Sequence, residues 1–191
     1  QKQPYSSKFD AVVRGQATLD AAQARGLALF RDPGKGNCAA CHTVRPDSGN
    51  PADSPFANFG FYALGVPRNT AIASNASATF FDLGLCGPIR TRPVVPAAFS
   101  TELSSDALCG QFRVTSLRNV AERPSYMHNG FFTSLREVVR FYATRDSQPA
   151  AWWGAAGVPN DLPSQYQPNL ERRIAPLNRT PAQGDALTDA E

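Results

Sequence analysis

The sequence predicts a mainly α domain in which a few helices are joined by long irregular loops. Two observations carry this prediction: two segments have the apolar spacing of helices, and the remainder is rich in turn-forming residues. Among 191 residues there are 16 Pro and 14 Gly, and 42% of the chain is hydrophobic. This length and composition suit one globular domain over residues 1–191, with a substantial core.

The first helix is predicted over residues 18–32. Thr18 or Asp20 can cap its start. Gly26 lies on the apolar face, where it costs about 1 kcal/mol relative to Ala, so we expect another backbone to approach it closely. The residues of this face recur at spacings of three and four: Leu19, Ala22, Gly26, Leu29 and Phe30.

The second helix is predicted over residues 133–146. Ser134 and Glu137 have the spacing of a capping box. Tyr142 shares one face with three aliphatic residues at helical spacing, so we expect it to face inward, whereas Phe141 lies about 100° round the helix. The aliphatic residues of that face are Leu135, Val138 and Val139.

The segment between these helices, residues 43–110, has no sustained period and is predicted to be a long ordered loop region. We expect bulky aromatic side chains to anchor it in the core. The candidates are Phe56, Phe59, Phe61, Tyr62, Phe80 and Phe81. At the other end of the chain, Thr188 and Glu191 have the spacing of a helix N-terminus. We therefore expect a final helix that residues 1–191 do not contain.

The charge pattern gives no support for nucleic-acid binding. The formal net charge is +3 and the pI is near 8.8, with Lys and Arg spread along the chain. No apolar run approaches the roughly 18 to 20 residues that a membrane span needs. The chain opens on Gln1 without a charged and apolar leader, so we expect a soluble, already processed protein.

The chemistry of the chain is concentrated in the run Cys38-Ala39-Ala40-Cys41-His42. Cys-x-x-Cys-His is the attachment signature of haem c, in which both thiols bond to the haem and the histidine ligates the iron. A zinc site would need a second ligand pair at short spacing, and a redox dithiol would need a βαβ setting. We therefore predict one covalent haem, with His42 as an axial ligand, in a cytochrome-c-like domain.

This haem prediction bears on the two other cysteines. Covalent haem attachment takes place outside the cytoplasm in bacteria, where disulfides persist, so we expect a periplasmic or otherwise extracytoplasmic protein. Cys86 and Cys109 are then most simply a structural disulfide, with two unpaired buried thiols as the alternative. A bridge over roughly two dozen residues would contribute about 3 kcal/mol.

The second axial ligand of the iron has three candidates: Met127, His128 and Tyr142. Methionine or histidine would give a low-spin electron carrier, whereas a phenolate oxygen is a hard ligand that favours ferric and higher-valent iron. The helix face on which Tyr142 lies does not by itself decide between Tyr142 and Met127 as the second ligand.

The run from Cys109 to Tyr142 resembles the C-terminal haem domain of the bacterial dihaem cytochrome c peroxidase and MauG-like family. Together with RGLALF, CAACH, DLGLCGPIRT and ALTDAE, the resemblance covers most of the chain. The residues that match the motif of the family are Phe112, Leu117, Arg118, Asn119, Tyr126, His128, Gly130, Leu135 and Val139.

The resemblance implies His42/Tyr142 ligation of the iron. The peroxidase branch has a Met fourteen residues after the motif histidine and the MauG branch has a Tyr there, and counting on from His128 reaches Tyr142. Met127 is then a packing residue. For His128 we expect a structural role, with inter-haem hydrogen bonding as the alternative. For Arg118 we consider a contact to a haem propionate, since guanidinium matches carboxylate, beside an ordinary loop-bracing role.

The resemblance also implies a function, with one departure from the family. Family members carry a second haem in an N-terminal domain, and this chain has a single Cys-x-x-Cys-His. We expect it to relay electrons and stabilise oxidising equivalents for a peroxide-reacting haem in a missing domain or second protein, with a redox partner protein. The alternative is a stand-alone monohaem electron-transfer cytochrome. The family also binds calcium between its domains, but Arg123 and Ser125 stand where Thr and Pro are common, so calcium is not predicted here.

Overall fold

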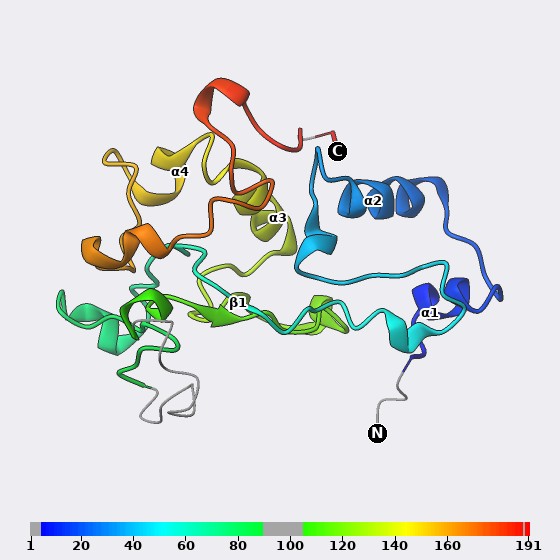
Figure 1. Cartoon of the computed structure of the whole chain (residues 1–191), viewed down its shortest axis with the longest axis horizontal. Helices are drawn as coiled ribbons and strands as arrows, with labels where there is room; N and C mark the ends of the chain where they lie inside the picture. Colours follow the sequence, from blue (N-terminus) through cyan, green and yellow to red (C-terminus); the bar gives the residue numbers. More distant parts are fainter. Residues whose placement is uncertain (1–4, 90–104, 189) are drawn as a thin grey trace.

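The computed structural model describes residues 5–89, 105–188 and 190–191 (Figure 1). Four α-helices are present in these ranges: α1 (Lys8–Val13), α2 (Ala21–Arg31), α3 (Leu135–Thr144) and α4 (Pro149–Trp153). The strands β1 (Phe61–Tyr62) and β2 (Phe112–Arg113) form one antiparallel pair. Short 3₁₀ helices lie at Cys38–Ala40, Pro51–Asp53, Ala73–Ala76, Ser105–Leu108, Val120–Glu122, Ser164–Asn169 and Pro181–Gln183. The described chain is thus mostly helix and loop with little strand, as the sequence predicts.

Figure 1 shows how the elements are arranged around the middle of the molecule. Helix α3 lies near the centre, with α4 on one side and α2 on the other, while β1 runs below α3 and α1 lies below α2. The 3₁₀ turn Cys38–Ala40 contacts α2. None of the helices in the described ranges is long and apolar enough to cross a membrane.

Helix α2 begins where the sequence predicts but is less buried than expected. The Asp20 side chain caps it by accepting a hydrogen bond from the Gln23 backbone N–H at 2.8 Å, and Gln23 returns a bond to Asp20. None of its residues is buried. The expected close approach at Gly26 is wrong for the described residues, because a Cβ there would meet nothing within 4 Å.

Helix α3 is capped by Ser134, whose hydroxyl accepts from the Arg136 backbone N–H at 3.2 Å, without the predicted box with Glu137. The prediction of its inward face is partly wrong. Phe141 is completely buried, whereas Val139 is 50% exposed. Together with Val66, Phe132 and Trp153, Phe141 forms the main buried cluster, so α3 packs on the core through the neighbouring face.

The aromatic residues predicted to anchor residues 43–110 are not the core. Phe59 is 47% exposed and Phe61 38% exposed, and the other four are only half-buried. Phe56 and Phe59 both have positive φ angles, of 51° and 58°, which non-glycine residues adopt rarely. A second buried cluster is formed by Ala63, Leu162 and Leu170.

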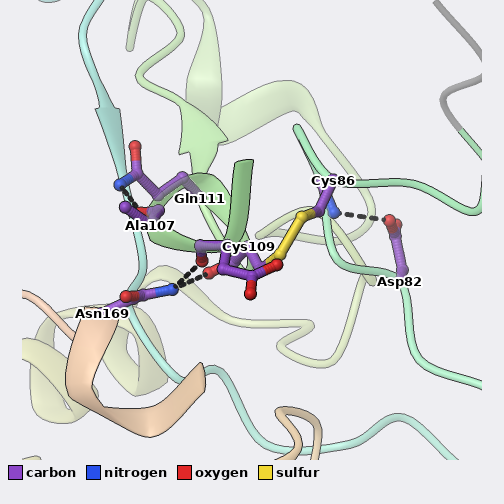
Figure 2. The surroundings of a disulfide bond; sticks show 8 residues. Asp82, Cys86, Ala107, Cys109, Gln111 and Asn169 are labelled. Atoms are coloured by element: carbon purple, nitrogen blue, oxygen red, sulfur yellow. Dashed lines mark hydrogen bonds between the residues drawn. A yellow bond between two sulfur atoms is a disulfide. The ribbon is translucent and has the colours of Figure 1, made fainter. Parts of the chain in front are cut away.

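The loop region is fastened by a disulfide between Cys86 and Cys109, the pairing expected from the sequence (Figure 2). The Asn169 side-chain amide donates to the carbonyl oxygens of Asp106 and Cys109, at 2.7 and 3.0 Å. Gln111 Nε2 donates to the Ala107 carbonyl at 2.9 Å. The bridge is therefore tied to the segment 164–169 as well as to the turn that carries Cys109.

Candidate functional site

The Cys-x-x-Cys-His run forms a tight turn directly after α2. Cys38 opens the 3₁₀ helix, and its carbonyl accepts the backbone N–H groups of Cys41 at 3.2 Å and His42 at 2.8 Å. Gly36 is required just before it, because a Cβ there would lie 2.8 Å from the Leu29 carbonyl oxygen. The turn gathers two thiols and an imidazole within five residues, as covalent haem attachment requires.

The His42 imidazole is oriented by a backbone carbonyl. Its Nδ1 lies 2.8 Å from the Phe56 carbonyl oxygen, so Nδ1 donates the proton and the lone pair of Nε2 is left for a metal. Burial lowers the pKa of His42, which keeps the ring neutral. A metal-ligating histidine commonly donates its other ring N–H to a carbonyl in this way.

Both thiols at the site are unpaired and half-buried. Burial raises the pKa of Cys38 to about 11 and also raises the pKa of Cys41, so both are neutral thiols at ordinary pH. The Tyr62 hydroxyl hydrogen-bonds the Cys41 thiol and accepts from Asn58 Nδ2 at 2.9 Å. The Asn58 backbone N–H in turn donates to the Cys41 carbonyl at 2.7 Å, which packs loop 56–62 around this cysteine.

Tyr142 on α3, a candidate ligand from the sequence, lies within electrostatic range of the two thiols. Negative charge on either thiol, were it ionised, would raise the pKa of Tyr142 beyond the effect of burial, although about 100 residues separate them in sequence. Burial raises the pKa of Tyr142, so the free phenol is neutral and would lose its proton only to a strong electrostatic partner such as a metal ion.

The face of α3 that carries Tyr142 is left partly open by the protein. Val139 and Leu135 lie three and seven residues before Tyr142, on the same side of the helix, and Val139 is half exposed. An exposed apolar surface on the helix face that carries Tyr142 fits a flat apolar group such as a haem. Within the described ranges no three His, Cys, Asp or Glu side chains converge as ligands of a bare metal ion.

The other candidate ligands have contacts elsewhere. Met127 has a positive φ of 68° and packs against the buried cluster of Val66, Phe132, Phe141 and Trp153. The imidazole of His128 stacks on Phe112 with ring centroids 3.5 Å apart, and its Nε2 lies 4.0 Å from Asp161. These contacts give both residues roles in packing.

Arg118 has a protein carboxylate as its partner. Its Nη1 donates to both carboxylate oxygens of Asp10 at 3.0 and 3.1 Å, and Nη2 donates to the Pro51 and Ser54 carbonyls at 3.0 Å each. Its Nε is buried without a partner among the described residues. This is the loop-bracing role considered from the sequence. The contact to a haem propionate stays a prediction, and within the described part of the chain Nε is the one donor of Arg118 left to make it.

Several residues of the site carry no recognisable signal in the sequence. Tyr62 and Asn58 reach Cys41 from a loop, the Phe56 carbonyl reaches His42, and Asn37 Nδ2 donates to the Ala175 carbonyl at 2.8 Å. Each contact joins segments that are distant in sequence or runs through the backbone, so no motif or periodicity reports it.

Similarity to individual known proteins, and not to a family model, shows which family the chain belongs to. No family model matches it. It is 33% identical over 170 residues to the methylamine utilization protein MauG of Paracoccus denitrificans, covering 83% of this chain and 40% of that protein. It is also 33% identical over 142 residues to the cytochrome-c peroxidase IdrP1 of a Pseudomonas species, covering 70% of this chain and 34% of that protein.

The similarity extends to the fold. The crystal structure of the dihaem peroxidase BthA from Burkholderia thailandensis matches 98% of this chain with a TM-score of 0.86 and 40% identity. A variant of BthA with a tyrosine-to-methionine substitution matches with a TM-score of 0.87 and 39% identity. In both cases the match covers 43% of the BthA chain, so the present chain spans less than half the length of these relatives. The chain belongs to the family of MauG-like dihaem peroxidases.

Proposed function

We propose that this chain is the haem c domain of a MauG-like or dihaem-peroxidase-like oxidoreductase. In this proposal Cys38 and Cys41 would attach one haem, and His42 and Tyr142 would ligate its iron. The observation that carries the proposal is the tight turn that gathers Cys38, Cys41 and His42 and leaves Nε2 of His42 free. The electrostatic influence of both thiols on Tyr142 supports its part in the proposal. A bound haem would supply reversible one-electron chemistry at its iron.

The residues of the chain have separate tasks in this function. The Phe56 carbonyl holds the Nδ1 proton of His42, which keeps Nε2 free as a donor. The Tyr142 oxygen is a hard anionic donor that stabilises an oxidised iron. Leu135 and Val139, on the same face of α3 as Tyr142, would offer apolar surface to the haem.

The domain would relay electrons and stabilise oxidising equivalents for a peroxide-reacting haem that lies elsewhere. Two observations support this role: the relatives named above are MauG and peroxidases, and the chain spans less than half of their length while holding a single Cys-x-x-Cys-His. The second haem would belong to an N-terminal domain or a separate haem protein, with a redox partner protein exchanging electrons. The proposal includes neither calcium nor a choice between peroxide and a protein side chain as substrate.

A periplasmic location is part of this proposal. Haem c attachment and the Cys86–Cys109 bridge both suit an oxidising compartment outside the cytoplasm.

Mass spectrometry of the protein isolated from its natural host tests the haem. The chain should be heavier than its sequence by one haem, bound at Cys38 and Cys41. An unmodified mass, or zinc in elemental analysis, would overturn the proposal.

The second candidate function is a monohaem electron carrier, favoured by the single attachment motif. The natural reading frame separates the two functions. A frame that joins this chain to a second Cys-x-x-Cys-His supports the enzyme, and a signal peptide directly before Gln1 supports the carrier.

A further inference from the structure

An ion pair far from the thiols connects the N-terminal helix to the histidine of the site. Asp10 lies on α1 with its side chain fully buried, and its partner Arg118 lies 108 residues away in sequence. Ser7 holds Asp10 in place, because its backbone N–H donates to Asp10 Oδ2 at 2.9 Å. Ser7 therefore fixes the position of the carboxylate that the Arg118 guanidinium contacts.

The guanidinium of Arg118 connects this carboxylate to loop 51–56. Its Nη2 donates to the carbonyls of Pro51 and Ser54, and its carbon lies 5.4 Å from the ring centroid of Phe56. The Ser116 hydroxyl adds a bond to the Pro55 carbonyl at 2.7 Å. Three consecutive residues of the loop, 54 to 56, are thus held from the Arg118 side.

Phe56 is the residue through which the loop reaches the site. Its carbonyl accepts from His42 Nδ1 at 2.8 Å and from the Leu117 backbone N–H at 3.3 Å. Its backbone has a positive φ of 51°, which an unbranched L residue adopts at a cost of about 1–3 kcal/mol, so surrounding contacts must hold it there. The ring contacts with Phe9 at 5.0 Å and with Arg118 are such contacts.

We infer that Asp10 and Arg118 are positioning residues for His42, acting through the Phe56 carbonyl. The inference rests on the proposed function, since it requires His42 to ligate iron. A shorter or better aligned hydrogen bond to Nδ1 makes the imidazole a stronger donor and favours the ferric state. The clamp of Asp10, Arg118 and Phe56 therefore sets the reduction potential of the site from outside it.

The test measures the midpoint potential of the haem-loaded full chain. Asp10→Asn and Arg118→Gln should each raise it, changing the ferric to ferrous ratio at a fixed potential by about threefold or more, about 28 mV for one electron. Arg118→Lys keeps the positive charge but loses the several N–H donors of the guanidinium, so it should shift the midpoint potential less than Arg118→Gln does. Because the two residues act as one unit, the double variant should shift no further than the larger single one.

Arg68→Gln is the matched control. Arg68 also pairs with a buried carboxylate, Asp161, at 2.8 Å, and donates to three loop carbonyls, but it holds a different loop. It should lower the free energy of unfolding and leave the potential unchanged. If Arg118→Gln fails to fold, Asp10→Asn and Arg118→Lys still decide the question.

The possible results distinguish a failure of this inference from a failure of the proposed function. A wild-type protein without covalent haem ends the proposed function. A wild-type protein with haem whose potential is the same in the folded Asp10 and Arg118 variants, or shifts equally in Arg68→Gln, overturns the clamp alone.

Discussion

Replacing Arg145 with Met should cause the largest loss of stability among the substitutions considered for this chain. Arg145 lies one turn after Tyr142 with a completely buried side chain, and its Nη2 contacts Asp146 at 2.6 Å. It also donates to the carbonyls of Leu64, Glu171 and Leu177. Removing one partner of a buried pair costs about 3–5 kcal/mol, because the other charge is left without compensation.

Urea unfolding followed by circular dichroism measures this loss. With an m value of about 2 kcal/mol/M, the midpoint should fall by roughly 2 M. Arg136→Met on the exposed side of α3 is the control, and its effect should stay within about 0.5 kcal/mol. Adding Asp146→Asn to Arg145→Met should restore part of the loss, since it removes the unpaired charge. A loss below about 1 kcal/mol in Arg145→Met would refute the reasoning, because water would then replace every contact of the guanidinium.

Three further predictions concern the ligand, the bridge and the stacked histidine. Tyr142→Phe should change the ferric absorption spectrum and raise the potential, whereas Met127→Leu should cost less than about 1.5 kcal/mol and leave the spectrum intact; the opposite pair of spectra would reverse the assignment. Replacing both Cys86 and Cys109 by Ser should lower the free energy of unfolding by about 3 kcal/mol, from a sequence separation of 23 residues, and identical denaturation curves for the two proteins would show that the bridge contributes nothing. Burial lowers the pKa of His128 to about 4, so the unfolded state binds its proton first as the pH falls, and up to about 3 kcal/mol should be lost between about pH 6.5 and 4. That loss should shrink in His128→Gln when unfolding is measured across this range, and equal pH dependence in both proteins would contradict it.

The parts of the fold that could be predicted from sequence are those with local causes. Asp20 and Ser134 cap α2 and α3 because a short polar side chain can reach a nearby backbone N–H whatever surrounds the helix. The wrong expectations concern tertiary packing. Phe59 and Phe61 are aromatic and yet exposed, because hydrophobicity alone does not report which side chains of an irregular loop the tertiary packing buries.

Helix α3 shows why the candidate site could be predicted only in part. Periodicity groups Tyr142 correctly with Leu135 and Val139 but cannot say whether that face meets protein or a bound group. In the structure the neighbouring face, with Phe141, takes the core, and the face of Tyr142 is left partly open beside the thiols. An apolar face that a sequence assigns to the core is also what a buried prosthetic group requires.

The same division of α3 links the stability of the domain to the geometry of its site. Phe141 packs against both Phe132 and Trp152, with ring centroids 5.4 and 5.3 Å away, so the core holds this face of the helix. Tyr142 is the next residue, and its ring lies 5.9 Å from that of Phe141. Arg145 anchors the following turn to three carbonyls from other segments. Core packing at Phe141 and the hydrogen bonds of Arg145 therefore hold the part of α3 that carries Tyr142, which is the rigidity that the proposed ligation by Tyr142 requires.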